Sequence, residues 1–121
     1  MSKKNKEYDQ NIIAALKALP KPLKTFDGHD VLLDSDKRDE TIFEHIADKK
    51  HHLHVADIEV IPNILSKKES LYKDRSGKKY RSYIGRRGRQ KERVKYLKIV
   101  TEIRKGNKES IITIYLTKNR S

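Results

Sequence analysis

The chain has 121 residues, and its 29 Lys and Arg against 17 Asp and Glu give a formal net charge of +12. This length suits one domain with a small core, because 38% of the residues are charged and only 35% are hydrophobic. The absence of cysteine excludes a disulfide scaffold, a thiol nucleophile and a Cys-ligated metal site. No apolar run is long enough to cross a membrane, and none follows the N-terminal lysines, so we expect a soluble, cytoplasmic protein without a membrane partner.

The N-terminal part of the chain predicts one short helix. Residues 11–19 place Ile and Leu side chains on one helical face, and Pro20 and Pro22 stop the helix after them. Residues 31–33 form a short apolar run, which is either a strand or a buried segment. We treat residues 1–40 as an N-terminal helical extension of the main part of the domain.

Two further helices are expected in the middle of the chain. Thr41 is suited to cap the first of them, and Glu44 three residues later completes a capping box. Asp57 is suited to cap the second, residues 58–67, but Pro62 weakens its first turn because proline cannot donate a backbone hydrogen bond.

After Lys68 the hydrophobic pattern changes from helical to alternating. Four strands are expected: residues 70–73, 79–84, 96–104 and 110–117. The turn signal Asp74-Arg75-Ser76-Gly77 joins the first two, an Arg/Gly-rich connection over residues 85–91 follows, and a Gly-Asn turn precedes the last strand. The order predicts an α+β fold with N-terminal helices packed on a four-stranded antiparallel sheet, and residues 41–121 form the main part of one compact domain.

The positive charge is concentrated in one stretch. Residues 67–108 contain 17 Lys and Arg against four acidic residues, whereas the rest of the chain is nearly neutral. Four of the six tyrosines lie in the same stretch. Basic residues interleaved with aromatic ones are typical of contact with phosphates and unstacked bases, and the alternative is a solvated sheet face.

Four of the five histidines fall within ten residues: His45, His51, His52 and His54. No two histidines have the i, i+4 spacing that is usual for metal ligands on a helix, so we expect no metal site and no cofactor. On a continuous helix His45 and His52 share a face, whereas His51 joins His45 only if the helix ends near Lys50.

These histidines suit metal-free RNA cleavage, in which the ribose 2′-OH attacks the adjacent phosphorus. This reaction needs a base, an acid and groups that stabilise the charged phosphorane, and histidine titrates near neutrality. The candidate catalytic residues are His45, His51, His52, Thr113 and Tyr115; the candidate substrate-binding residues are Arg81, Tyr83, Arg86, Arg87 and Arg89. Thr113 and Tyr115 share one face of the last strand, a pattern that ordinary strand propensity also explains.

The chain resembles the barnase–EndoU–colicin–RelE-like (BECR-fold) ribonucleases, especially their phage-associated branch. The resemblance covers residues 41–117 and depends on His45-Ile46, on Lys50-His51-His52-Leu53, on Pro62-Asn63-Ile64-Leu65, on the basic hairpin and on the final Thr113-Ile114-Tyr115. It implies a metal-independent, toxin-like endoribonuclease that acts on RNA, with transfer RNA a candidate substrate and an immunity or antitoxin protein a candidate partner. It matches His45 to the leading histidine, His51 or His52 to the second, and Arg86 more loosely to a phosphate-binding arginine.

Two other functions stay open at this point. A non-catalytic RNA- or DNA-binding module of a phage or mobile element needs only the basic, tyrosine-bearing stretch. The other is a protein-interaction partner, such as an antitoxin or adaptor. In such a protein the positive charge of residues 67–108 would serve solubility alone.

Overall fold

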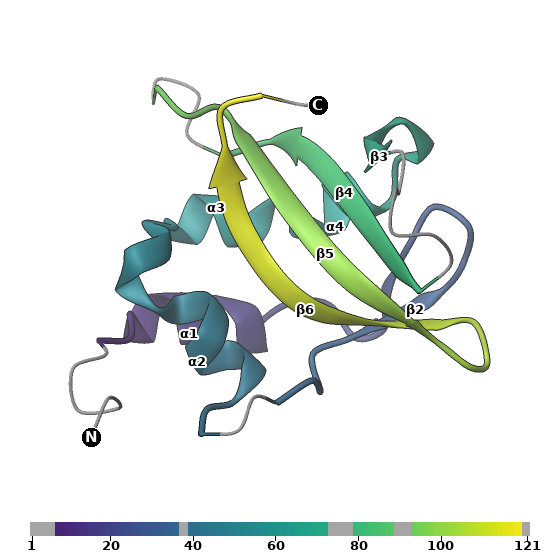
Figure 1. Ribbon diagram of the computed structural model, residues 1–121, viewed down its shortest axis with the longest axis horizontal. Helices are drawn as coiled ribbons and strands as arrows, with labels where there is room; N and C mark the ends of the chain where they lie inside the picture. The colour runs from purple at the N-terminus through teal and green to yellow at the C-terminus, as the bar shows by residue number, and fades with distance from the viewer. Residues whose placement is uncertain (1–6, 37–38, 73–78, 89–92, 120–121) are drawn as a thin grey trace.

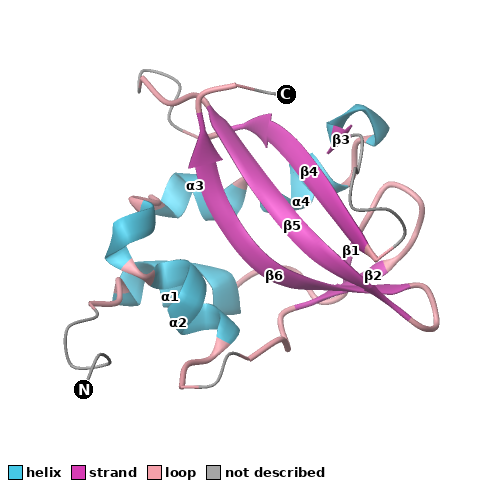
Figure 2. Ribbon diagram, in the orientation of Figure 1, coloured by secondary structure: helices cyan, strands magenta, loops and turns pink. Residues whose placement is uncertain are grey.

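The computed structural model describes residues 7–36, 39–72, 79–88 and 93–119, and its fold is α+β (Figures 1 and 2). The helices are α1 (Gln10–Lys17), α2 (Ile42–Ala47), α3 (Val55–Glu59) and α4 (Ile61–Leu65), with the 3₁₀ helices η2 (Lys49–His51) and η3 (Lys68–Ser70). The strands are β1 (Leu23–Lys24), β2 (Asp30–Leu32), β3 (Leu71–Tyr72), β4 (Tyr80–Arg86), β5 (Tyr96–Arg104) and β6 (Lys108–Thr117). Within the described ranges, no helix has the length and apolar character needed to span a lipid bilayer.

The sheet is larger than the sequence predicted. Its six strands are ordered β1-β2-β6-β5-β4-β3, so the expectation of four antiparallel strands was wrong. The four predicted strands do form an antiparallel meander, but β2 adds to β6 in parallel through Asp30, Val31 and Leu32, and β1 pairs antiparallel with β2. The sheet is therefore mixed, and Figure 1 shows it strongly curled.

The segment before residue 41 is part of this sheet and of the core. Helix α1 is capped by Asp9, whose carboxylate accepts from the backbone N–H of Asn11, and it buries Ile12 and Leu16 against the other helices. The apolar run predicted at residues 31–33 supplies most of β2. The segment predicted as a helical extension thus contributes one helix and two strands to the fold.

The helices in the middle of the chain begin and end for local reasons. The predicted capping box at Thr41 and Glu44 is present, with both reciprocal hydrogen bonds formed. The single helix expected over residues 58–67 is instead two, α3 and α4. Pro62 stands in the first turn of α4, where its missing N–H costs least. Asp57 is not the N-cap of α3 but its third residue, and its carboxylate accepts from the backbone N–H of the N-cap His54.

The concave face of the sheet and the helices enclose the core, which includes Ile42, Ile46, Ile58, Leu97 and Ile99. The other face of β4, β5 and β6 turns away from the helices, and no described helix lies in front of these strands in Figure 1. A bulge opposite Val100 and Thr101 shifts β6 by one residue, so that Ile111 and Ile114 both face the core. Beyond the bulge, Thr113 and Tyr115 share the outward face, as predicted.

Candidate active site

The chain turns sharply after α2, and this turn brings two of the predicted histidines together. Asp48 leaves the helical conformation at ψ 124°, η2 follows, and His52 takes the left-handed conformation at φ 56°. The rings of His45 and His51 consequently meet edge to face, with centroids 5.6 Å apart and an interplanar angle of 76°. Helix α2 therefore ends before Lys50, which is the condition under which the sequence predicted that His51 would join His45.

Beside this turn lies an open cavity of about 510 Å³, within the range of ligand sites. Three segments meet there: the η2–α3 corner, the connection between β4 and β5, and the end of β6. The lining residues are Lys50, His51, His52, His54, Arg87, Arg93, Val94, Tyr115, Leu116, Thr117 and Lys118. Four of these are Lys or Arg and none is acidic, so among the described residues the wall of this "histidine cavity" favours an anion.

His51 has a defined tautomer in its neutral form. Its Nδ1 lies 3.2 Å from the carbonyl oxygen of Ile46, and a carbonyl only accepts, so Nδ1 donates and carries the hydrogen. The neutral ring then has its lone pair on Nε2. This nitrogen has no hydrogen-bond partner among the residues that the structure describes. The arrangement suits a general base.

His45 lies behind His51 and does not line the cavity. Its Nδ1 is 3.1 Å from Oε1 of Glu40, and the other oxygen of Glu40 accepts a 2.9 Å hydrogen bond from the Tyr8 hydroxyl. Burial and the hydrogen bond to Glu40 raise the pKa of Tyr8 to about 12. This chain of contacts, Tyr8 to Glu40 to His45 to His51, fixes His45 as a support for the His51 ring.

Arg87 also lines the histidine cavity, and it forms a buried ion pair with Asp57. Its Nε and Nη2 donate to the two carboxylate oxygens of Asp57 at 3.1 and 2.9 Å, and its Nη1 donates to the carbonyl of Val94. Asp57 is 0% exposed and Arg87 only 4%. A guanidinium has five N–H donors, so two donors of Arg87, one on each terminal nitrogen, have no acceptor in the described part of the chain.

Other groups on the wall are also uncommitted. The ring of His52 and the hydroxyl of Tyr115 have no hydrogen-bond partner among the described residues. His52 is exposed and Tyr115 is half-buried. Thr113 lies two residues along the strand from Tyr115, opposite Val100, and does not line the cavity.

The structure places the other predicted arginines elsewhere. Arg81 and Tyr83 lie on the concave face of the sheet, away from the histidine cavity. Arg86 is exposed over the ring of Tyr96, and both line a second cavity of about 560 Å³. Arg87 lines both cavities. Arg89 lies outside the described residues.

Arg81 and Tyr83 belong to a buried cluster around Glu109, which was not predicted from the sequence. Glu109 is 0% exposed and accepts four hydrogen bonds of 2.8 Å. The donors are Arg81 Nη1, the Tyr83 hydroxyl, the Thr101 hydroxyl and His29 Nδ1. Arg81 also donates to Asp27, so the cluster fastens the loop between β1 and β2 to strands β4 and β6. Because burial dominates, the pKa of Tyr83 is raised.

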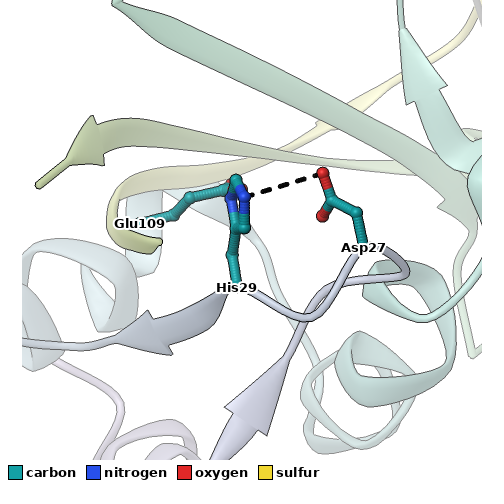
Figure 3. Close-up of side chains that lie close together, drawn as sticks. All are labelled: Asp27, His29 and Glu109. Atoms are coloured by element: carbon teal, nitrogen blue, oxygen red, sulfur yellow. Dashed lines mark hydrogen bonds and ion pairs between the residues drawn. The ribbon is translucent and has the colours of Figure 1, made fainter. Parts of the chain in front are cut away.

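The same cluster contains three residues of metal-ligand type. Figure 3 shows His29 between the carboxylates of Asp27 and Glu109, and their ligand atoms all lie within 4.8 Å of one another. However, the guanidinium of Arg81 donates to both carboxylates. It supplies the positive charge that a metal ion would bring, so these residues fit a structural cluster rather than a cation site.

This cluster makes the stability of the fold sensitive to acid. Hydrogen bonds from Arg81 lower the pKa of Asp27 from 3.8 to about 2. The contribution of Asp27 to the free energy of unfolding is therefore present above pH 4 and is lost as the pH falls towards 2. We expect the free energy of unfolding to fall less steeply in this window for Asp27→Asn than for the wild type, as measured by urea titration. Asp39→Asn, at an exposed aspartate, is the control, and an unchanged slope for Asp27→Asn would contradict the assignment.

Comparisons with protein-family models, with curated protein sequences and with solved structures found no match to this chain. The similarity to BECR-fold ribonucleases stays a prediction, and the site has to be interpreted from its own geometry. Arg93, His54 and Lys118 also line the histidine cavity, although they were not among the candidate residues predicted from the sequence. The only signal for them was their closeness in sequence to the selected residues.

Proposed function

We propose that this protein is a metal-independent endoribonuclease whose active site is the histidine cavity. The main support for the proposal is the geometry of His51. Its Nδ1 donates a hydrogen bond to the Ile46 carbonyl, and its Nε2 is left as an acceptor in a cationic cavity. His52 and the hydroxyl of Tyr115 line the same cavity, and neither has a hydrogen-bond partner among the described residues. A base, an acid and phosphate-binding groups are what transesterification of RNA needs.

The reaction balances with these groups alone. His51 Nε2 takes the proton of the ribose 2′-OH as the 2′-oxygen forms a bond to phosphorus. The bond from phosphorus to the 5′-oxygen breaks, and His52 gives that oxygen a proton. The products are a 2′,3′-cyclic phosphate and a 5′-hydroxyl, with one proton gained by His51 and one lost by His52.

The remaining wall residues stabilise charge. Two N–H donors of Arg87 have no acceptor among the described residues, and Asp57 holds the guanidinium in place, which suits these donors to the non-bridging oxygens of the phosphate. The Tyr115 hydroxyl is a further donor. Lys50, Arg93 and Lys118 raise the local concentration of a polyanion by their charge. His45 is a positioning residue in this scheme, because it contacts the His51 ring and not the cavity.

The test is cleavage of a single-stranded RNA by the purified protein in excess EDTA. We expect fragments that end in a 2′,3′-cyclic phosphate and begin with a 5′-hydroxyl, as resolved by end-specific labelling. The His51→Ala protein, purified in parallel, controls for a contaminating nuclease. Cleavage that EDTA abolishes, or fragments with a 5′-phosphate, would contradict the proposed chemistry.

Binding without cleavage would instead favour the non-catalytic nucleic-acid-binding module. In that case the affinity should fall steeply with salt, since the charge on the chain would supply most of it. Transfer RNA as the substrate and an immunity protein as a partner stay predictions of the family resemblance.

A further inference from the structure

The outward face of the sheet carries aromatic rings and cations in contact with one another. The ammonium of Lys98 on β5 lies 5.6 Å from the ring centroid of Tyr115 on β6 and 5.6 Å from that of Tyr72 on β3. Lys98 therefore stands between two tyrosines that lie on strands on opposite sides of β5. All three side chains are half-buried, so part of each remains open to solvent.

A second pair lies beside this one. Arg86 and Tyr96 are direct partners across β4 and β5, with the guanidinium 6.0 Å from the ring centroid. Tyr96 is in turn directly opposite Thr117, which lines the histidine cavity. We call these five residues, Tyr72, Arg86, Tyr96, Lys98 and Tyr115, the tyrosine–lysine face.

The charge on this side of the sheet is divided along the strands. The tyrosine–lysine face occupies the end nearest the histidine cavity. The acidic residue on the outward side of β5, Glu102, lies towards the other end, where it pairs with Lys79 and Arg104. Lys98 and Arg86 have no acidic partner in the described part of the chain. Their charge is therefore available to phosphates.

We propose that the tyrosine–lysine face binds single-stranded RNA and leads it to the histidine cavity. This inference rests on the proposed function, because Tyr115 belongs to both surfaces. Aromatic rings on a sheet hold bases by stacking, and neighbouring cations hold the backbone between them. In duplex RNA the bases are already stacked and paired, so the rings have nothing to bind. The substrate class is thus unpaired RNA longer than the two nucleotides that flank the cut.

The experiment compares Tyr72→Ala with Tyr72→Phe, both in the His51→Ala protein so that bound RNA stays intact. The probe is a fluorescently labelled 12-nucleotide RNA without secondary structure, and the comparison ligand is a blunt-ended duplex of 12 base pairs. Stacking is worth about 1–3 kcal/mol per base, so Tyr72→Ala should weaken binding of the single strand by about 5- to 150-fold. Tyr72→Phe keeps the ring and should bind like its parent, and the affinity for the duplex should not change in either variant.

A second variant guards against a folding defect at Tyr72. For the single strand, Lys98→Gln should reduce the magnitude of the slope of log affinity against log salt by about 0.7, as expected when one phosphate contact is lost. An unchanged affinity for Tyr72→Ala together with an unchanged slope for Lys98→Gln would overturn the inference. Absence of RNA cleavage by the wild-type protein would overturn the proposed function. The binding comparison would still decide whether the tyrosine–lysine face holds RNA.

Discussion

Replacement of His51 by alanine should lower kcat/KM for RNA cleavage by about 10²- to 10⁴-fold, the usual effect of losing a general base. His51 is the wall histidine whose neutral tautomer is set by a backbone carbonyl, so no other residue offers the same Nε2 acceptor in the same place. The fold should be unaffected, because His51 is half-buried and makes one side-chain hydrogen bond to the chain. The measurement is steady-state cleavage of a labelled RNA in EDTA.

The pH profile separates His51 from His52. Cleavage by the wild type should rise with pH as the base loses its proton and fall again as the acid loses its proton, which gives a bell-shaped curve. His51→Ala should flatten the acidic limb and His52→Ala the alkaline limb. Lys49→Ala, at an exposed neighbour outside the cavity, is the control and should leave both limbs in place. A full rate in His51→Ala would remove this residue from the mechanism.

Replacement of Asp57 by alanine should lower the free energy of unfolding by about 3–5 kcal/mol, because it leaves a buried arginine without its partner. The carboxylate accepts from Arg87 twice and also from the backbone N–H groups of His54 and Gly88. Four donors thus lose their acceptor in one change. Urea unfolding followed by far-UV circular dichroism measures the loss.

A double variant shows how much of this loss comes from the isolated charge. Asp57→Ala combined with Arg87→Met removes the unpaired guanidinium, so it should regain part of the stability lost by Asp57→Ala alone. The recovery should be incomplete, since the N–H groups of His54 and Gly88 still lack an acceptor. A loss below about 1 kcal/mol for Asp57→Ala would show that the pair is worth no more than a surface salt bridge.

Local signals predicted the parts of the fold that depend on local chemistry. The capping box at Thr41 and the alternation over residues 96–104 are both present, and β5 has the predicted bounds. The parallel pairing of β2 with β6 had no such signal. It joins residues 30–32 to 108–110, and neither segment reveals its partner in its own composition.

Four of the candidate site residues line one cavity: His51, His52, Arg87 and Tyr115. The alternation of the last strand placed Tyr115 on its outward face, whereas the sequence left open whether the helix ends before His51. Arg81 and Tyr83 were grouped with them because basic and aromatic residues in a charged stretch suggest a surface. Alternation along a strand shows which of its residues share a face. It does not show that Glu109, on another strand, accepts hydrogen bonds from Arg81 and Tyr83 on that face.

The parallel pairing of β2 with β6 also determines when the sheet can be completed during synthesis. Leu32 has been added to the chain long before its partner Ser110, and at about 5–20 residues per second the interval is roughly 4 to 16 seconds. The turn that carries His51 likewise precedes Tyr115. Neither the sheet nor the proposed active site is complete until the last strand has been made. A nascent chain that does not yet extend to β6 therefore lacks Tyr115 and Thr117 from the wall of the histidine cavity.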